Sequence, residues 1–143
     1  MKKIKLMLMS LIVCPILITS CNSSDVKESK STEPIFNSEE GYVIVNKFGI
    51  DSLKFINSVK ELKEEDKISS LIYMTCLFAE SNCKNELTFK PLDAFILKND
   101  GDTILVNLTF EAQNSYGVPG KLSAYVPFLN DEPLLETAII TEN

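Results

Sequence analysis

The sequence predicts a small α+β domain in which two helices pack on a three-stranded antiparallel meander, preceded by a short N-terminal strand. Three observations support this fold class. Apolar and polar residues alternate over residues 104–113 and again over 122–128, which is typical of strands with one buried face. Apolar residues recur at three- and four-residue spacing over 53–62 and 68–79, which is typical of helices. Asp100-Gly101 offers a two-residue hairpin turn.

The first half of the domain is expected to contain a strand and two helices. Residues 42–48, YVIVNKF, are β-branched and aromatic enough for a short strand, which Gly49 ends. Asp51 is then a suitable N-cap for a helix whose buried face is Leu53, Ile56, Val59 and Leu62. The acidic run 64–66 starts a second helix with the buried face Ile68, Leu71, Ile72, Thr75, Cys76 and Ala79. One long helix through the acidic run is the alternative.

The second half is expected to form the meander. The two-residue turn pairs Leu97 with Ile104 and Phe95 with Val106, so the apolar residues of both strands share one face. The predicted buried faces of the next two strands are Ile104, Val106, Leu108, Phe110 and Ala112, then Leu122, Ala124, Val126 and Phe128. Because Pro127 has no amide hydrogen, the last strand is expected at an edge of the sheet.

The first 20 residues have the composition of an export signal. Three lysines precede an apolar run from residue 6 to 18, which is shorter than the about 20 residues of a membrane-spanning helix. The sequence Ile-Thr-Ser-Cys at 18–21 resembles the lipobox of bacterial lipoproteins, in which the cysteine is lipidated and the chain is cut before it. The resemblance implies that Cys21 carries acyl chains such as palmitate and that Cys14 is removed. A plain secretory signal is the alternative.

The resemblance divides the chain into a signal peptide (1–20), a lipidated flexible tether (21–40) and a single domain (41–143). The tether is polar and lacks an apolar period, so it cannot bury enough surface to offset its ordering entropy. Ile35 and Phe36 interrupt it, and we expect them either to dock on the domain or to form a short recognition segment. Asn22 favours the outer membrane where the cell has one.

Composition excludes several functions. The mature chain has 11 lysines, no arginine and 20 acidic residues, a net charge of −9, so nucleic acid is a poor partner. The chain has no histidine, which excludes Ser-His-Asp and Cys-His nucleophiles and histidine metal sites. We predict no cofactor, no metal site and no catalytic residue, although a hydrolase that uses a carboxylate such as Glu111 is a third possibility.

Cys76 and Cys83 are expected to form a disulfide. Seven residues of continuous helix would separate their Cα atoms by about 10 Å, beyond bonding reach, so the helix must end first. Residues 80–82 are suitable for that end, and exported proteins meet an oxidising compartment. A redox pair is the functional alternative.

Two loops carry candidate sites. The segment NSYG offers Asn114 and Tyr116 as a binding loop, although both residues could instead serve turn geometry and packing. The strand and loop VNLTFEAQNSYGVPG resemble a hairpin of small bacterial exported domains of unassigned function. In NDGD, Asn99, Asp100 and Asp102 form either a turn or the start of a calcium loop.

These observations predict a lipid-anchored protein of the cell envelope that binds or scaffolds an envelope protein or glycan. A polar tether, an acidic surface and the lack of a catalytic signature all favour this function. The alternative is an inhibitor or immunity-type protein that binds a basic partner through its negative charge.

Overall fold

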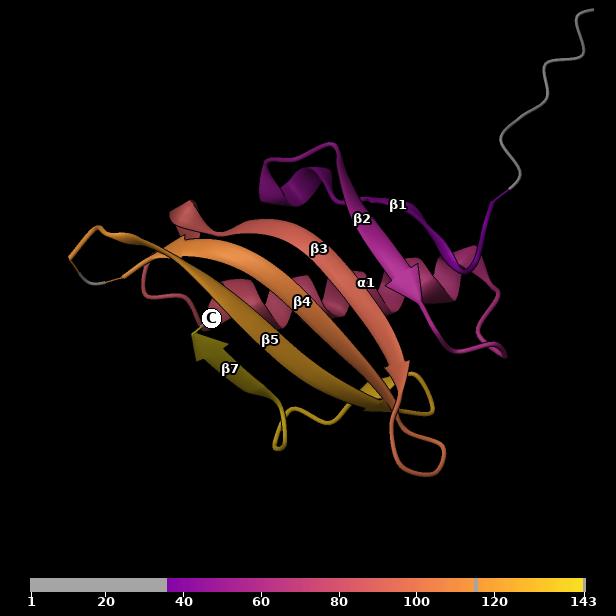
Figure 1. The fold of residues 1–143 in the computed structure, drawn as a ribbon. Helices are drawn as coiled ribbons and strands as arrows, with labels where there is room; N and C mark the ends of the chain where they lie inside the picture. The colour runs from indigo at the N-terminus through magenta and orange to yellow at the C-terminus, as the bar shows by residue number, and fades with distance from the viewer. Residues whose placement is uncertain (1–35, 115, 143) are drawn as a thin grey trace, which may run out of the picture. The chain divides into compact units, whose positions relative to one another are not determined.

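The computed structural model describes residues 36–114 and 116–142. The expected signal peptide, Cys21 and most of the expected tether lie outside these residues. The described chain forms one seven-stranded sheet and one α-helix, with a 3-10 turn at Asn46–Phe48 and another, η2, at Glu86–Thr88 (Figure 1). The predicted fold of two helices on a three-stranded meander is therefore wrong, because the domain is mostly β.

The sheet has the strand order β1-β2-β3-β4-β5-β6, and β7 also pairs with β5. Its strands are β1 (Glu40–Ile44), β2 (Ser52–Asn57), β3 (Lys90–Lys98), β4 (Ile104–Gln113), β5 (Pro119–Leu129), β6 (Glu132–Pro133) and β7 (Ile139–Glu142). All pairs are antiparallel except β2 with β3. A parallel pair needs a crossover connection, which α1 (Glu65–Ser81) provides. The helix α1 runs along one face of the sheet (Figure 1).

The first predicted helix is instead strand β2 and the loop that follows it. Leu53, Phe55 and Asn57 are buried and alternate with less buried residues, which is the two-residue period of a strand. The buried Val59 and Leu62 belong to the loop, so the three-residue spacing that predicted a helix was coincidental.

The second predicted helix is confirmed as α1. All six residues of its predicted face are buried, and Ile68, Ile72, Cys76 and Ala79 have no exposed surface. The helix follows Glu64, so the acidic run does start a separate helix. Glu65 and Asp66 lie in its first turn, where the helix dipole favours negative charge.

The meander is confirmed as β3-β4-β5, but its first hairpin is shifted by one residue. Ile96 pairs with Val106, and Leu97 pairs with Leu105. The turn is longer than predicted, because the Asn99 amide donates to the Thr103 carbonyl (2.9 Å) around a three-residue loop. Ala94 and Ile96 of β3 are therefore buried, in place of the predicted Phe95 and Leu97.

Strand β5 is not at the edge of the sheet. It pairs with β4 from Pro119 to Phe128, with β7 at Leu122–Tyr125 and with β6 at Phe128–Leu129. Pro127 lies in the gap between these last two pairings. Its carbonyl accepts a hydrogen bond from the Leu134 amide (2.8 Å), so the sheet continues past the missing amide hydrogen.

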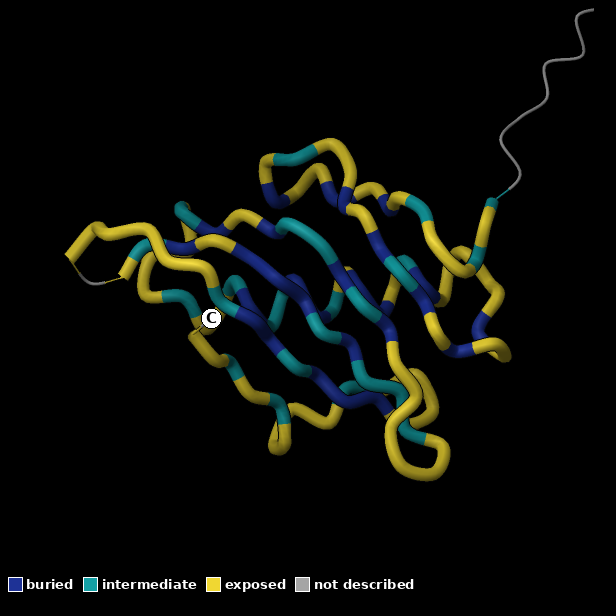
Figure 2. Tube along the Cα trace, viewed as in Figure 1, coloured by how far each residue is buried: buried dark blue, intermediate teal, exposed yellow. Residues whose placement is uncertain are grey.

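The hydrophobic core lies between α1 and the sheet face that it covers (Figure 2). The inward residues predicted for β4 and β5 contribute to it, and Phe55, Phe110 and Phe128 are its largest fully buried side chains. Phe36 packs against this core and stacks on Phe55, with ring centroids 6.1 Å apart. Docking is thus confirmed for Phe36, whereas Ile35 lies outside the described residues. No helix of the described residues is long and apolar enough to cross a membrane.

Candidate functional site

The loop between β4 and β5 is closed by Asn114. The Asn114 Oδ1 atom accepts hydrogen bonds from the backbone amides of Tyr116 (2.9 Å) and Val118 (3.1 Å). The Asn114 carbonyl also accepts one from Gly117, whose positive φ of 76° suits glycine. The Asn114 side chain therefore shapes the turn, as one of the two interpretations expected.

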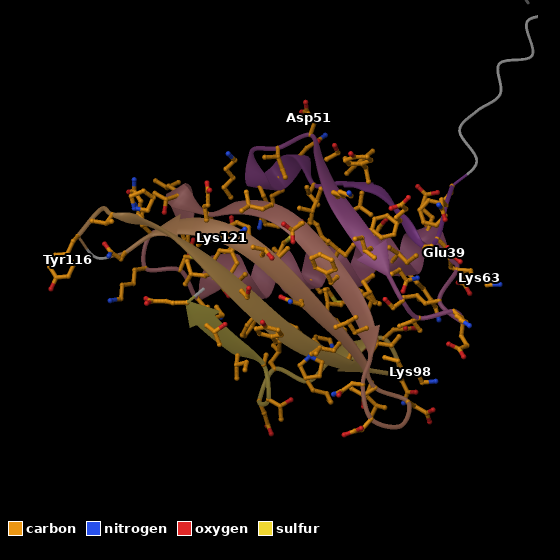
Figure 3. The ribbon with its side chains drawn as sticks, viewed as in Figure 1. Glu39, Asp51, Lys63, Lys98, Tyr116 and Lys121 are labelled. Atoms are coloured by element: carbon orange, nitrogen blue, oxygen red, sulfur yellow. The ribbon has the colours of Figure 1, made fainter. Side chains whose placement is uncertain are left out.

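Tyr116 does not pack against the domain. Its side chain is 89% exposed and points away from the end of the sheet (Figure 3). The interpretation of Tyr116 as a packing residue is therefore wrong, because its side chain is exposed to solvent. Such an exposed aromatic side chain provides rigid contact area for an interface.

Behind this loop lies a cavity of about 350 Å³. Its apolar lining comes from alternate residues of three strands and includes Phe110, Ala112, Leu122 and Ile140. Polar and charged residues also line it: Asn82, Lys84, Gln113, Asn114, Lys121 and Glu142. A cavity that combines an apolar floor with polar groups is typical of a binding site.

The cavity exists because α1 ends before the strands do. The helix stops at Ser81, where the Asn82 amide group donates to the Phe78 carbonyl (2.8 Å) and ends the helical pattern. Gly120 leaves further space, because a Cβ atom there would meet only the Ala112 carbonyl oxygen, at 4.0 Å. The helix therefore leaves this end of the sheet uncovered.

Three exposed apolar side chains belong to the same end of the sheet: Leu87 (97% exposed), Tyr116 and Val118 (56% exposed). The Thr88 hydroxyl accepts a hydrogen bond from the Gln113 amide (3.0 Å), which holds η2 and its Leu87 beside the end of β4. We call these three side chains and the cavity the hairpin end.

The structure describes Cys76 and Cys83 as free thiols, so the predicted disulfide is not formed in it. The physical reason is that α1 continues to Ser81, so the chain cannot turn back before Cys83. Seven residues of helix separate two Cα atoms by about 10 Å, which is beyond the reach of a disulfide. Burial raises the pKa of the Cys76 thiol to about 12 and that of the Cys83 thiol to about 11, and Glu80 adds to both shifts. Cys83, which lines the cavity, donates to the Ala79 carbonyl (3.1 Å).

A larger cavity of about 510 Å³ lies at the start of β1 and the end of β2. It is lined by residues 37–40 and 56–60 and by Lys63, and includes carboxylates and ammonium groups. Figure 3 places Glu39 and Lys63 at the opposite end of the sheet from Tyr116. Only two of its lining residues, Ile56 and Val59, have apolar side chains, whereas the cavity behind the β4–β5 loop has six, so that cavity offers the larger apolar surface to a partner.

The remaining candidate residues lie in the β3–β4 turn and in strand β4. Asn99 and Asp100 belong to the β3–β4 turn, as the turn interpretation expected. Glu111 lies opposite Lys121 in the backbone register of β4 and β5. No group of three or more Asp, Glu or Cys side chains in the described part of the chain could hold a metal ion.

Comparison with known proteins gives no matching family model, no similar curated protein and no similar solved structure. The interpretation of the hairpin end therefore depends on its own geometry. Of the sequence-predicted site residues, the structure brings Asn114 and Cys83 to one cavity and places Tyr116 beyond it. The sequence did not indicate the cavity floor or Leu87.

Proposed function

We propose that this protein is a membrane-tethered binding module of the cell envelope, and that its hairpin end holds an apolar segment of an envelope protein. One observation carries the proposal: three exposed apolar side chains lie at the same end of the sheet as a cavity with an apolar floor. Large exposed apolar groups that gather at one place typically mark an interaction site.

The chemistry of the hairpin end favours a peptide over a glycan. Leu87 and Val118 are aliphatic, and the floor formed by Phe110, Leu122 and Ile140 suits an apolar side chain. The amide groups lining the cavity can bind peptide groups beside such an anchor. A glycan could bond to the polar lining residues, but its hydroxyl groups over the apolar floor would have no hydrogen-bond partners, which is costly.

Charge does not favour an inhibitor of a basic partner at this end. The lining contains Lys84 and Lys121 together with Glu142, so both signs are present. A basic partner would be selected by a surface of one sign.

The location of the hairpin end also supports the proposal. The described chain begins beside Glu39, at the end of the sheet opposite Tyr116 (Figure 3). If Cys21 is lipidated, the tether joins the domain at the end that the proposed partner does not use. The tether and the partner would then not compete for the same surface.

A photo-crosslinking experiment tests the proposal. The full-length protein is produced in its own envelope with benzoylphenylalanine in place of Tyr116 or, separately, of Leu87. We expect both positions to give the same discrete crosslinked species, and mass spectrometry to map the attachment to an apolar segment of the partner. Benzoylphenylalanine at Lys63 is the matched control, because that exposed residue lies at the other end of the sheet.

Gly120→Leu separates specific binding from surface stickiness. The new side chain has room for its Cβ atom and projects toward the cavity, and leucine is more favourable than glycine in a strand. We expect this variant to keep its melting temperature and to lose the crosslink through residue 116. Crosslinking that persists in Gly120→Leu, or that is equal at residues 63 and 116, would contradict the proposed function.

A further inference from the structure

The outer edge of β1 is free in the described residues. β1 ends the strand order, and its one recorded partner is β2. We propose that β1 pairs antiparallel with β1 of a second copy of this chain, around a two-fold axis at Tyr42, so that one sheet continues through both copies. No residue of β1 belongs to the hairpin end, so this inference does not depend on the proposed function.

Backbone alternation identifies the groups that are free to pair. The Asn57 amide donates to the Glu39 carbonyl (2.7 Å), so Glu39 directs its backbone groups toward β2. In an antiparallel ladder this direction alternates along the strand. Gly41 and Val43 therefore also face β2, whereas the N–H and C=O groups of Glu40, Tyr42 and Ile44 point outward.

The edge has the composition of a pairing strand. Residues 40–44, EGYVI, contain neither lysine nor proline, the residues that natural sheets use to protect an edge. Tyr42 is 67% exposed and Ile44 is 77% exposed, although both residues favour strands. An unpaired apolar edge of this kind is a template for another strand.

The sequence of β1 is self-complementary in one register. A two-fold axis at Tyr42 pairs all five residues, with Tyr42 opposite itself and Glu40 opposite Ile44 of the second copy. Every outward N–H and C=O group of the strand then has a partner. An axis at Glu40 would instead place two carboxylates opposite each other, which is destabilising. An axis at Ile44 would bring Asn46, in a 3-10 turn, into the ladder.

The size of the contact indicates the strength of the dimer. A five-residue strand pair is smaller than a standard stable interface of about 800 Å² per partner, so a weak, concentration-dependent dimer is expected. A shared membrane would raise the effective concentration of tethered copies. That last step relies on lipidation at Cys21, whereas the pairing itself does not.

Cysteine crosslinking of the full-length protein in detergent tests this geometry. In the proposed register the two Tyr42 Cα atoms are about 5.5 Å apart, within the 4.4–6.8 Å range of a disulfide. The two Ile44 Cα atoms are separated by four residues along the strands, about 13 Å. After mild oxidation we therefore expect at least about tenfold more crosslinked dimer from Tyr42→Cys than from the matched variant Ile44→Cys.

Controls and sedimentation complete the test. The wild-type chain measures the crosslinking caused by its own thiols, and mass spectrometry must locate the new bond between the two residues at position 42. Sedimentation of the wild type should show a reversible monomer–dimer equilibrium. Equal crosslinking of the two variants, a monomer at every concentration, or growth beyond a dimer would each overturn the proposal, since head-to-tail edge pairing gives open-ended assemblies.

Discussion

At the scale of single residues, two asparagines in strands have opposite roles. The Asn57 side chain donates to the carbonyls of Ser38 and Leu62 (both 2.8 Å), and its Oδ1 atom accepts from the Val59 amide (2.9 Å). The loop after β2 and the segment before β1 have no regular secondary structure. These side-chain bonds fix both of them to the end of β2. By contrast, the Oδ1 atom of Asn107 is buried without a hydrogen-bond partner.

This difference predicts opposite effects of the same substitution. Asn57→Leu should lower the free energy of unfolding by about 2–3 kcal/mol, because it leaves buried backbone groups without partners. Asn107→Leu removes a buried acceptor that bonds to nothing, so it should change stability by less than about 1 kcal/mol or raise it. Urea unfolding of both variants provides the measurement. Equal losses of unfolding free energy in the two variants would mean that the hydrogen bonds of Asn57 do not stabilise the fold.

The buried Cys76 thiol predicts a pH-dependent stability. Its pKa is raised from 9.0 to about 12, chiefly by burial. The thiol is protonated in both states below about pH 9, and at higher pH it ionises first in the unfolded chain, which favours unfolding. Stability from this group is therefore lost as the pH rises from about 9 toward 12.

Cys76→Ala removes that ionisation. The difference in melting temperature between the wild type and Cys76→Ala should shrink as the pH rises from about 8.5 to about 10.5. Ile72→Val is the matched control, because it changes the same face of α1 without a titrating group. A Cys76→Ala difference that stays as constant with pH as the Ile72→Val difference would count against the burial of the thiol.

At the scale of elements, the sequence predicts what has a clear period. The α1 face and the inward faces of β4 and β5 were predicted correctly because their apolar residues keep one period over several turns or residues, and Thr75 is the one polar member of the α1 face. β2 was missed because Asn57 occupies an inward position, where its hydrogen bonds take the place of an apolar contact. With Asn57 at its end, the inward set of β2 has only two apolar residues, Leu53 and Phe55, which is too short to show a two-residue period.

The register of the first hairpin gives a prediction at this scale. Ile96 is fully buried against the core, whereas Leu97 is on the other side of β3 and partly exposed. Ile96→Asp should therefore prevent folding or cost several kcal/mol, because it buries an unpaired carboxylate. Leu97→Asp should fold with a far smaller loss. Thermal unfolding compares the stability of the two variants. A larger loss of stability for Leu97→Asp would contradict the observed register and support the one in which a two-residue turn pairs Leu97 with Ile104.

At the scale of the whole molecule, the hairpin end could not be predicted from local patterns. Its residues come from the segment just after α1, from β4 and β5 and the loop between them, and from β7, so only the folded sheet brings them together. Asn114 and Tyr116 were identified by loop chemistry alone. One further signal was present, because Gly120 interrupts the inward alternation that Leu122 continues, and this missing side chain becomes part of the cavity.

The last prediction concerns the attachment of the whole molecule to its membrane. The lipobox resemblance implies that Cys21 is acylated, and two or more acyl chains hold a protein stably on a bilayer. Cys21→Ala should therefore abolish labelling by a fatty-acid analogue and move the protein from the membrane fraction. Cys14→Ala should change neither result, because that residue is expected to be removed with the signal. Equal labelling of Cys21→Ala and the wild type would rule out lipidation at this cysteine.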